Sequence, residues 1–276
     1  MPIMPETDFT SLQQEILSFF ASEDHSRIRL AVPEEVQQKE ISLLKDTLMN
    51  GERFFFVINL LNFEMEHAHG IQKWLGYGEK EFSLRQYWDT VVHPSRRQSL
   101  LLIVRHMYEL LCRGAYPLQF MVQRFATLVP LRHRQGHYIL TKKTASVFQY
   151  DKNNRLISYL DEFTIISHSY HGEPLQPVMY NSHGERELEK ERAIMNQVME
   201  RFVCMKVFTR SELQTIRCLV YDTNITQSEI ARQMGCTVNT ISTYYRRFLA
   251  KARDFYGQDF PSVLDAALYL KREGLI

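Results

Sequence analysis

The sharpest pattern of apolar and polar positions in this sequence lies near its C-terminus. Between Gln227 and Met234 apolar residues recur at helical spacing, and Gly235 follows, the residue best suited to end a helix. A second helix is predicted to begin almost at once. The same spacing predicts that its buried face consists of Val238, Ile241, Tyr245, Phe248 and Ala252. The pattern therefore predicts two helices that cross through a sharp turn.

Signals at the ends of these two helices support the same interpretation. Thr226 can cap the first helix with Glu229 three residues later, the reciprocal arrangement of a capping box, and Thr237 can cap the second. Two steeply crossing helices need a small residue at the crossing, a glycine in the turn and a branched anchor. The structural residues of the predicted helix-turn-helix are Thr226, Glu229, Ala231, Gly235, Thr237 and Ile241. The alternative is an ordinary helical hairpin with a solvated cationic face.

The opposite face of the second helix carries short polar side chains and cations. Between Val238 and Arg253 there are four Lys or Arg residues and no acid. A helix that lies in the major groove of DNA needs short side chains that let its backbone approach the base edges. It also needs cations for guanines and phosphates. We therefore expect this helix to contact double-stranded DNA.

Residues 206–276 resemble the LuxR-type helix-turn-helix domain of bacterial transcription factors. The resemblance rests on the opening FTRSEL, on ITQSEIARQMGCTVNTIS, and on the last stretch from Val263 to the terminal Gly-Leu-Ile. The chain departs from the family at Ser211, at Tyr244 and in a longer loop at residues 221–224. By position, the family's base-reading sites fall on Ser242, Thr243 and Arg246, and its backbone contacts on Tyr244, Arg247 and Lys251. With Asn239 and Thr240 added, the predicted DNA-binding residues are Asn239, Thr240, Ser242, Thr243, Tyr244, Arg246, Arg247 and Lys251.

The middle of the chain changes to strand-like patterns. Strands are predicted at FFFVINL, FEMEHAH and residues 118–131, 138–150 and 156–166, with helices between the second and the third. Trp74-Leu75-Gly76-Tyr77 followed by Val92-His93-Pro94 is similar to a motif pair of the PAS family. This resemblance implies a five-stranded antiparallel sheet with helices on one face, which in some members encloses a ligand.

Two further segments read as helical. Residues 1–48 predict two helices, with stripes at Leu12, Ile16, Phe19 and Phe20, and at Val36, Leu43, Leu44 and Leu48. These stripes must pack on the next domain or on a second copy of the chain. After a linker-like stretch, Leu188, Met195 and Phe202 recur at intervals of seven, which suits either a short coiled coil or a helix folded back on its own chain.

The predicted fold class is α+β: N-terminal helices and a PAS-like five-stranded antiparallel sheet with helices, followed by an all-α LuxR-type domain. The predicted divisions are an N-terminal helical segment, a PAS-like sensor or dimerisation domain, a linker with a connecting helix, and the DNA-binding domain. Their ranges are 1–48, 49–169, 170–205 and 206–276.

No enzyme, cofactor or metal site is predicted. The sequence shows no paired carboxylates in a shared motif, no Gly-rich phosphate loop and no nucleophile with a flanking base. No cysteine precedes Cys112, which argues against flavin photoadduct chemistry, and His93 and His106 read as structural or surface residues rather than haem ligands. Neither the pair His67 and His69 nor the pair His133 and His137 is accompanied by the carboxylate or cysteine ligands of a good metal site. The sequence does not decide whether the PAS-like domain binds an unidentified small ligand.

Composition sets the remaining bounds. The 276 residues are 45% hydrophobic, with no apolar run long enough for a membrane span and no signal peptide, so we expect a cytoplasmic protein. Residues 206–276 hold 10 Lys and Arg against 7 Asp and Glu, a net charge of +3, whereas the rest carries −2. We expect a dimeric transcriptional regulator whose partners are double-stranded DNA, a second copy and RNA polymerase. The alternatives are a sigma-factor-like protein, or a constitutive regulator whose PAS-like domain is only a protein-interaction module.

Overall fold

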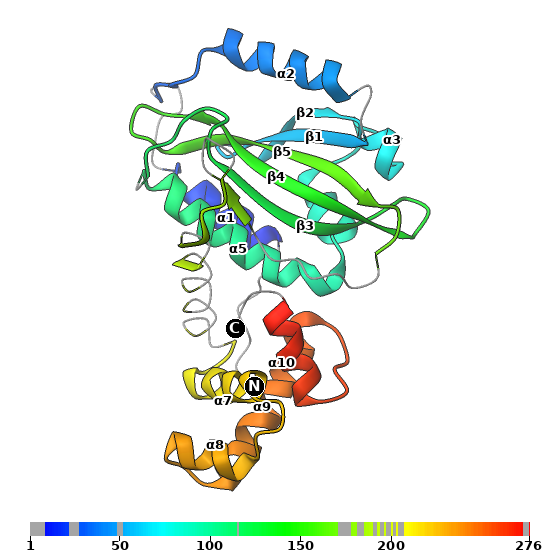
Figure 1. Ribbon diagram of the computed structural model, residues 1–276. Helices are drawn as coiled ribbons and strands as arrows, with labels where there is room; N and C mark the ends of the chain where they lie inside the picture. The colour runs from blue at the N-terminus through cyan, green and yellow to red at the C-terminus, as the bar shows by residue number, and fades with distance from the viewer. Residues whose placement is uncertain are drawn as a thin grey trace. The chain divides into compact units, whose positions relative to one another are not determined.

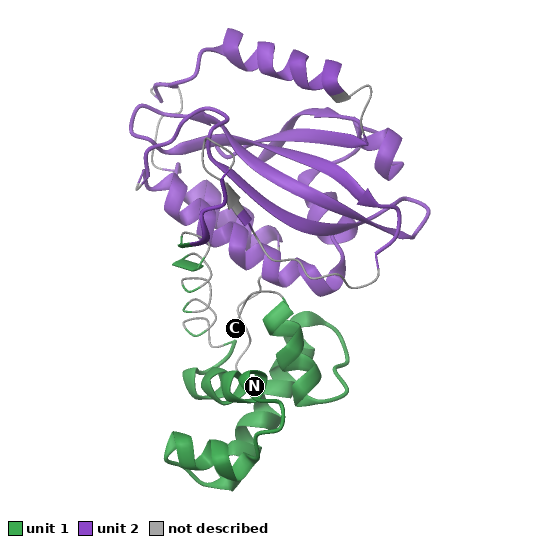
Figure 2. Cartoon of the chain, in the orientation of Figure 1, with its two compact units in different colours: residues 1–6, 174–176, 189–276 green, residues 7–173, 177–188 purple. Residues whose placement is uncertain are grey.

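A computed structural model of the chain divides into two compact units, which are described separately (Figure 2). One unit holds the described residues between 7 and 173 and between 177 and 188, and the other holds those from 189 onward. The structure describes residues 9–21, 28–48, 52–114, 116–170, 178–180, 185–189, 192–193, 196, 200, 203, 207–272 and 276.

The first unit is built on an antiparallel sheet with the strand order β2-β1-β5-β4-β3-β6 (Figure 1). The predicted fold class, a PAS-like antiparallel sheet with helices followed by an all-α region, is confirmed. The sheet is wider than predicted, because β6 pairs with β3 from a segment that was predicted to be linker. Its strands are β1 (Arg53–Asn59), β2 (Glu64–His69), β3 (Arg124–Arg132), β4 (Tyr138–Tyr150), β5 (Leu156–Ser167) and β6 (Val178–Tyr180).

Helices cover both faces of this sheet, not one face as the PAS resemblance implied. Figure 1 shows α2 on one face and α1 with α5 on the other. The reason is that both faces of the sheet are apolar: successive residues of β1, such as Phe54 and Phe55, are buried on opposite sides. The helices are α1 (Phe9–Ser18), α2 (Glu34–Leu48), α3 (Ile71–Leu75), α4 (Leu84–Gln86), the π-helical turn η2 (Tyr87–Val91) and α5 (Pro94–Cys112).

The larger core lies between the sheet and the α1, α3 and α5 side. Phe54 and Phe163 stack there with ring centroids 4.6 Å apart, from the neighbouring strands β1 and β5. Helix α1 joins this core through Leu12 and Ile16, and the turn after it through Phe20, three residues of the predicted stripe. Of the two alternatives that the sequence left open, α1 packs on the next domain of its own chain and not on a second copy.

Helix α2 packs on the sheet through Leu44 of its predicted stripe and through Ile41, which was not predicted. Ile41 and Leu44 are buried against β1, β4 and β5, whereas Val36 and Leu43 are 43% and 55% exposed. Two apolar stripes compete on this short helix, and spacing within the helix cannot decide between them. The sheet face decides, because Ile41 and Leu44 meet four buried apolar side chains there, Phe55, Val57, Phe148 and Leu160.

Two strand predictions fail where single residues adopt the left-handed conformation. The strand predicted to start at Leu118 begins only at Arg124, because Met121 has a φ of 58° and cannot continue an extended chain. In β2, a register shift beside His67, whose φ is 46°, breaks the alternation that placed His67 and His69 on one face.

The second unit is helical, as predicted. Ahead of its first long helix, scattered described residues between 188 and 203 are helical. Met195 and Phe202 of the predicted heptads lie outside the described residues, and Leu188 is exposed. The helices of the unit are α7 (Arg210–Tyr221), α8 (Gln227–Met234), α9 (Val238–Tyr256) and α10 (Val263–Arg272).

Candidate nucleic-acid interface

Capping boxes fix the first turns of α7 and α8. At α8, Thr226 Oγ1 accepts a hydrogen bond from the Glu229 backbone N–H (3.3 Å), and Glu229 Oε2 accepts one from the Thr226 N–H (2.8 Å). The Thr226 N–H and the Thr226 hydroxyl both donate to the Glu229 carboxylate, and these two bonds lower its pKa because they stabilise the charged form. At α7, Thr209 and Glu212 form the same reciprocal pair. Both helix starts are therefore set by residues of their own first turn.

The turn between α8 and α9 is closed by Gly235. This residue has φ 62° and ψ 35°, and the next N–H, that of Cys236, donates to the carbonyl oxygen of Ala231 over 2.9 Å. Beneath the turn, Ile230, Ala231 and Ile241 form a buried cluster that joins the two helices. The small side chain of Ala231 lets the helices approach at their crossing, which fixes the direction of α9.

Helix α9 starts at the N-cap Thr237, whose hydroxyl oxygen accepts from the Thr240 N–H (3.2 Å). Of its predicted buried face, Ile241, Phe248 and Ala252 are fully buried and Tyr245 is half-buried. Val238 is 42% exposed, so its prediction as a buried residue is wrong. It occupies the first position of the helix, before the turn at which α9 meets the cluster around Ile241.

The residues predicted to contact DNA line the rest of α9. Two hydroxyls are engaged there: Ser242 Oγ donates to Gln227 Oε1 over 2.6 Å, and Thr243 Oγ1 donates to the Asn239 carbonyl oxygen over 2.9 Å. Gln227, the first residue of α8, was not singled out from the sequence. Asn239, Ser242, Arg246 and Arg247 are exposed, and Thr240, Thr243, Tyr244 and Lys251 are half-buried.

The four cations of this helix divide into two kinds. Lys251 Nζ lies 2.7 Å from Glu212 Oε2, and Arg253 Nε lies 3.0 Å from Asp259 Oδ1, so both charges have acidic partners. Arg246 and Arg247 form no hydrogen bond or ion pair with any other described residue. The exposed face of α9 therefore keeps two uncompensated guanidinium groups beside short polar side chains.

A second polar arrangement lies buried in the first unit. Lys143 Nζ of β4 is 2.8 Å from Asp161 Oδ2 of β5, and the Asp161 side chain is 0% exposed. Around the ammonium stand the rings of Tyr87, Trp88 and Tyr159, with centroids 5.9 to 6.0 Å from Nζ. Sequence reasoning missed this pair, although a charged residue within the apolar run of β5 is a visible signal.

Several polar atoms of this cluster lack partners. The Tyr87 hydroxyl and Trp88 Nε1 are buried and make no hydrogen bond to a described residue, and Lys143 is the one described partner of the Asp161 carboxylate. Burial raises the pKa of Asp161 and outweighs the opposing effect of Lys143. Buried polar groups in proteins are nearly always paired, so these atoms make the cluster a candidate binding site for a water or a small polar molecule.

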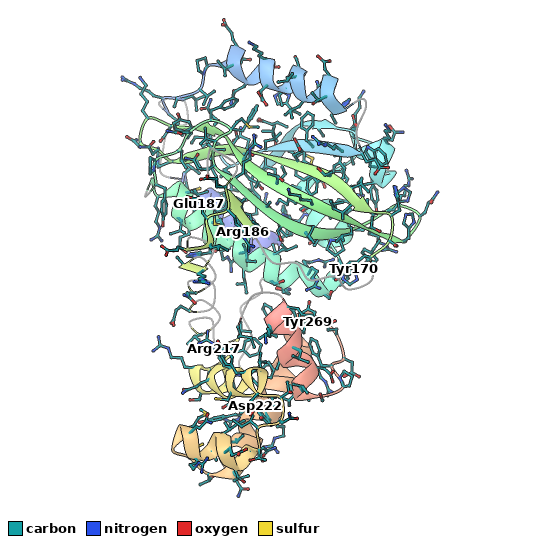
Figure 3. All side chains as sticks on the ribbon, in the orientation of Figure 1. Tyr170, Arg186, Glu187, Arg217, Asp222 and Tyr269 are labelled. Carbon is teal, nitrogen blue, oxygen red and sulfur yellow. The ribbon has the colours of Figure 1, made fainter. Side chains whose placement is uncertain are left out.

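The histidines considered as haem ligands have other surroundings. His93 caps α5, where its Nδ1 accepts from the Ser95 N–H (3.2 Å), and burial together with Arg96 and Arg97 lowers its pKa. Its ring also packs against Tyr170, labelled in Figure 3, whose hydroxyl accepts from Arg96. His106, predicted at a helix surface, is buried instead.

Searches for metal-binding groups and membrane spans gave no candidate in the part of the chain that the structure describes. No group of three or more His, Cys, Asp or Glu residues is placed there to hold a metal ion. None of the described helices is both long and apolar enough to cross a membrane.

Comparison of the sequence with known proteins gave no match to a family model and none to a curated protein. Comparison of the fold with solved structures gave low similarities. The N-terminal domain of a diguanylate cyclase with a PAS/PAC sensor from Marinobacter aquaeolei is 20% identical with a TM-score of 0.34, over 42% of this chain and 95% of that one.

Two structures of VqmA from Vibrio cholerae match over a longer span. A VqmA dimer without target DNA, described among LuxR-type receptors, is 14% identical with a TM-score of 0.32 and covers 86% of this chain and 88% of that one. A VqmA complex with ligand and DNA is 14% identical with a TM-score of 0.29, over 85% and 90%. Such low TM-scores describe a partial likeness of shape. What this chain does is therefore inferred from its own helices and side chains.

Proposed function

We propose that the chain is a bacterial transcriptional regulator in which residues 206–276 bind double-stranded DNA through α9. The observation that carries the proposal is the exposed face of α9, where Arg246 and Arg247 have no acidic partner among the residues that the structure describes. Ser242 and Asn239 lie beside them. The helix-turn-helix geometry supports the proposal, because Gly235 and the buried Ala231 set α9 at a fixed angle to α8.

We further propose that the regulator acts as a dimer in the cytoplasm. One recognition helix reads only a few base pairs, and two half-sites about one helical turn apart suit a two-fold symmetric protein. Residues 49–169, on which α1 and α2 of the N-terminal segment 1–48 pack, are proposed to sense or to dimerise. Residues 170–205 are proposed to connect them to the DNA-binding domain. RNA polymerase is the partner that a promoter-bound regulator would contact.

The sensing role rests on the buried Lys143 and Asp161 cluster. Unpaired hydrogen-bonding groups beside aromatic rings suit a small polar molecule that offers both donors and acceptors. The alternative is a PAS-like domain that serves only as a protein-interaction module. Thermal unfolding of the full chain across a panel of small polar metabolites separates the two. A rise in melting temperature that Tyr87→Phe abolishes supports sensing, and no rise with any compound supports the interaction module.

The DNA-binding proposal is tested by fluorescence anisotropy with the full chain. Binding to a duplex selected from random sequences should be far tighter than binding to an unrelated duplex, and should weaken as salt rises because phosphate contacts release counterions. Equal and weak binding to both duplexes would contradict a specific regulator. Copurification with RNA polymerase core in the absence of DNA would favour the sigma-factor-like alternative.

Dimerisation is tested by light scattering coupled to size exclusion, on the full chain and on a variant that starts at Lys206. A dimer that becomes monomeric on truncation would support pairing through the first unit and its connecting helix. Two monomeric proteins, in solution and on DNA, would remove the dimer from the proposal.

A further inference from the structure

The hydroxyl of Ser242 is held by a residue from the other helix of the motif. Gln227, the first residue of α8, offers its side-chain oxygen at 2.6 Å from Ser242 Oγ. That amide oxygen can only accept a hydrogen bond, so the proton of the bond belongs to Ser242. What Ser242 retains for an outside partner is the lone pairs of its oxygen.

Thr243 is restricted in the same way by a different group. Its Oγ1 donates to the backbone carbonyl oxygen of Asn239, four residues earlier in the same helix, over 2.9 Å. Arg246, one turn beyond Ser242, carries only donors. The exposed face of α9 therefore presents two hydroxyl acceptors followed by a guanidinium donor.

Base edges in the major groove differ in whether they offer an amino donor. Only adenine and cytosine carry amino groups that donate there, N6 and N4, whereas guanine O6 and N7, thymine O4 and adenine N7 accept. A free serine hydroxyl can rotate to donate or accept, and so distinguishes these two groups of bases poorly. A serine whose proton is already committed can only accept.

We propose that Gln227 sets the hydrogen-bond polarity of Ser242, so that Ser242 selects an amino base, adenine or cytosine, on the DNA strand that it contacts. The inference rests on the proposed function, because it assumes that α9 lies in the major groove. Gln227 is in this view a positioning residue: it acts on the base through Ser242, and its own contact with a base is not required.

The test is selection of binding sites from random duplex DNA by the full-length protein and its variants. The wild-type protein should restrict one position in each half-site to adenine or cytosine on one strand. Ser242→Ala should abolish that restriction, which identifies the position. Gln227→Ala should release the hydroxyl proton, so the preference for amino bases over guanine and thymine at that position should fall by roughly fivefold, the effect of one neutral hydrogen bond.

Gln227→Glu is the matched control, because a carboxylate of the same length also accepts the Ser242 proton. It should keep the preference for amino bases, although its charge lowers the affinity for every duplex. Thr243→Val, which keeps the shape and removes the hydroxyl, marks the position read by Thr243. That position should be unaffected by Gln227→Ala, because Asn239 holds the Thr243 proton. Equal melting temperatures across the variants show that the fold is intact.

Three results would overturn the inference and leave the proposed function standing: a wild-type preference for guanine or thymine at the Ser242 position, no preference there, or one that Gln227→Ala leaves unchanged. If the wild-type protein selects no sequence at all, the proposed function fails, and the inference fails with it.

Discussion

Lys251 on α9 is joined to Glu212 on α7 by an ion pair in which Nζ and Oε2 are 2.7 Å apart. The Glu212 side chain is 2% exposed, and its Oε2 also accepts from the backbone N–H of Thr209 over 2.7 Å. A cation that charge pattern and family resemblance assign to DNA is therefore already tied to the capping box of α7. This ion pair should therefore stabilise the helical domain.

Lys251→Met should lower the free energy of unfolding by about 1–3 kcal/mol, because it leaves a buried carboxylate without its cation. Urea unfolding measures this loss. Lys271→Met, which removes an exposed cation of α10, is the control and should change stability by less than about 0.5 kcal/mol. Unchanged stability together with a weaker salt dependence of DNA binding would instead make Lys251 the phosphate contact that the sequence predicted.

Substitution of Arg246 and substitution of Arg247 should weaken DNA binding in different ways. Arg246→Ala should weaken binding to the selected duplex by about 1–3 kcal/mol and relax its sequence preference, because a guanidinium on this face can read guanine. Arg247→Ala should weaken selected and random duplexes alike and reduce the salt slope by about 1, as the loss of one phosphate contact does. Anisotropy titrations at several salt concentrations separate the two. Identical behaviour of both variants would contradict the assignment.

Removing one partner of the buried Lys143–Asp161 pair should lower the free energy of unfolding far more than replacing both partners by apolar residues. Lys143→Met leaves the Asp161 carboxylate unpaired in the core and should destabilise the first unit by about 3–5 kcal/mol. The double replacement Lys143→Met with Asp161→Leu removes both charges and should recover most of that loss. Chemical denaturation of Lys143→Met, of Asp161→Leu alone and of the double variant measures the coupling. A double variant less stable than either single one would show that the pair itself stabilises the fold.

The raised pKa of Asp161 also predicts a pH dependence. Because the folded protein holds this proton more tightly than the unfolded chain, the free energy of unfolding should fall as the pH rises from the ordinary pKa of aspartate to the raised value. Asp161→Asn does not titrate, so its unfolding free energy minus that of the wild type should increase over that interval. A difference that stays constant between about pH 4 and pH 7 would contradict the raised pKa.

Gly235→Ala should destabilise the helix-turn-helix by about 1–2 kcal/mol through backbone strain alone. The residue has a φ of 62°, and a methyl group placed there would meet no atom within 4 Å. Gly257→Ala, at φ 60° with the same open space, should cost a similar amount. Only Gly235→Ala should also weaken DNA binding, because its turn sets the direction of α9. Thermal unfolding and anisotropy measured together test both statements.

Local signals in the sequence determined most of the helix-turn-helix. Thr226, Glu229 and Gly235 act within one turn of the residues that they cap, so their geometry follows from neighbours that the sequence displays side by side. The long strands β4 and β5 were also predicted from local signals, because the apolar and polar pattern of each strand and the residues of its turns are continuous along the chain.

Tertiary structure decided what depends on distant partners. Packing against the sheet determined which apolar residues of α2 are buried. Strand β6 forms by pairing with β3, whose residues lie about fifty positions earlier. The ion pairs of Lys251 and Lys143, and the bond between Ser242 and Gln227, join residues that spacing alone could not bring together. The sequence therefore determined that α9 is a helix with short polar and cationic side chains on one face. The fold decided which of its cations and hydroxyls already have partners, because a charge or a proton is committed only by the group placed beside it.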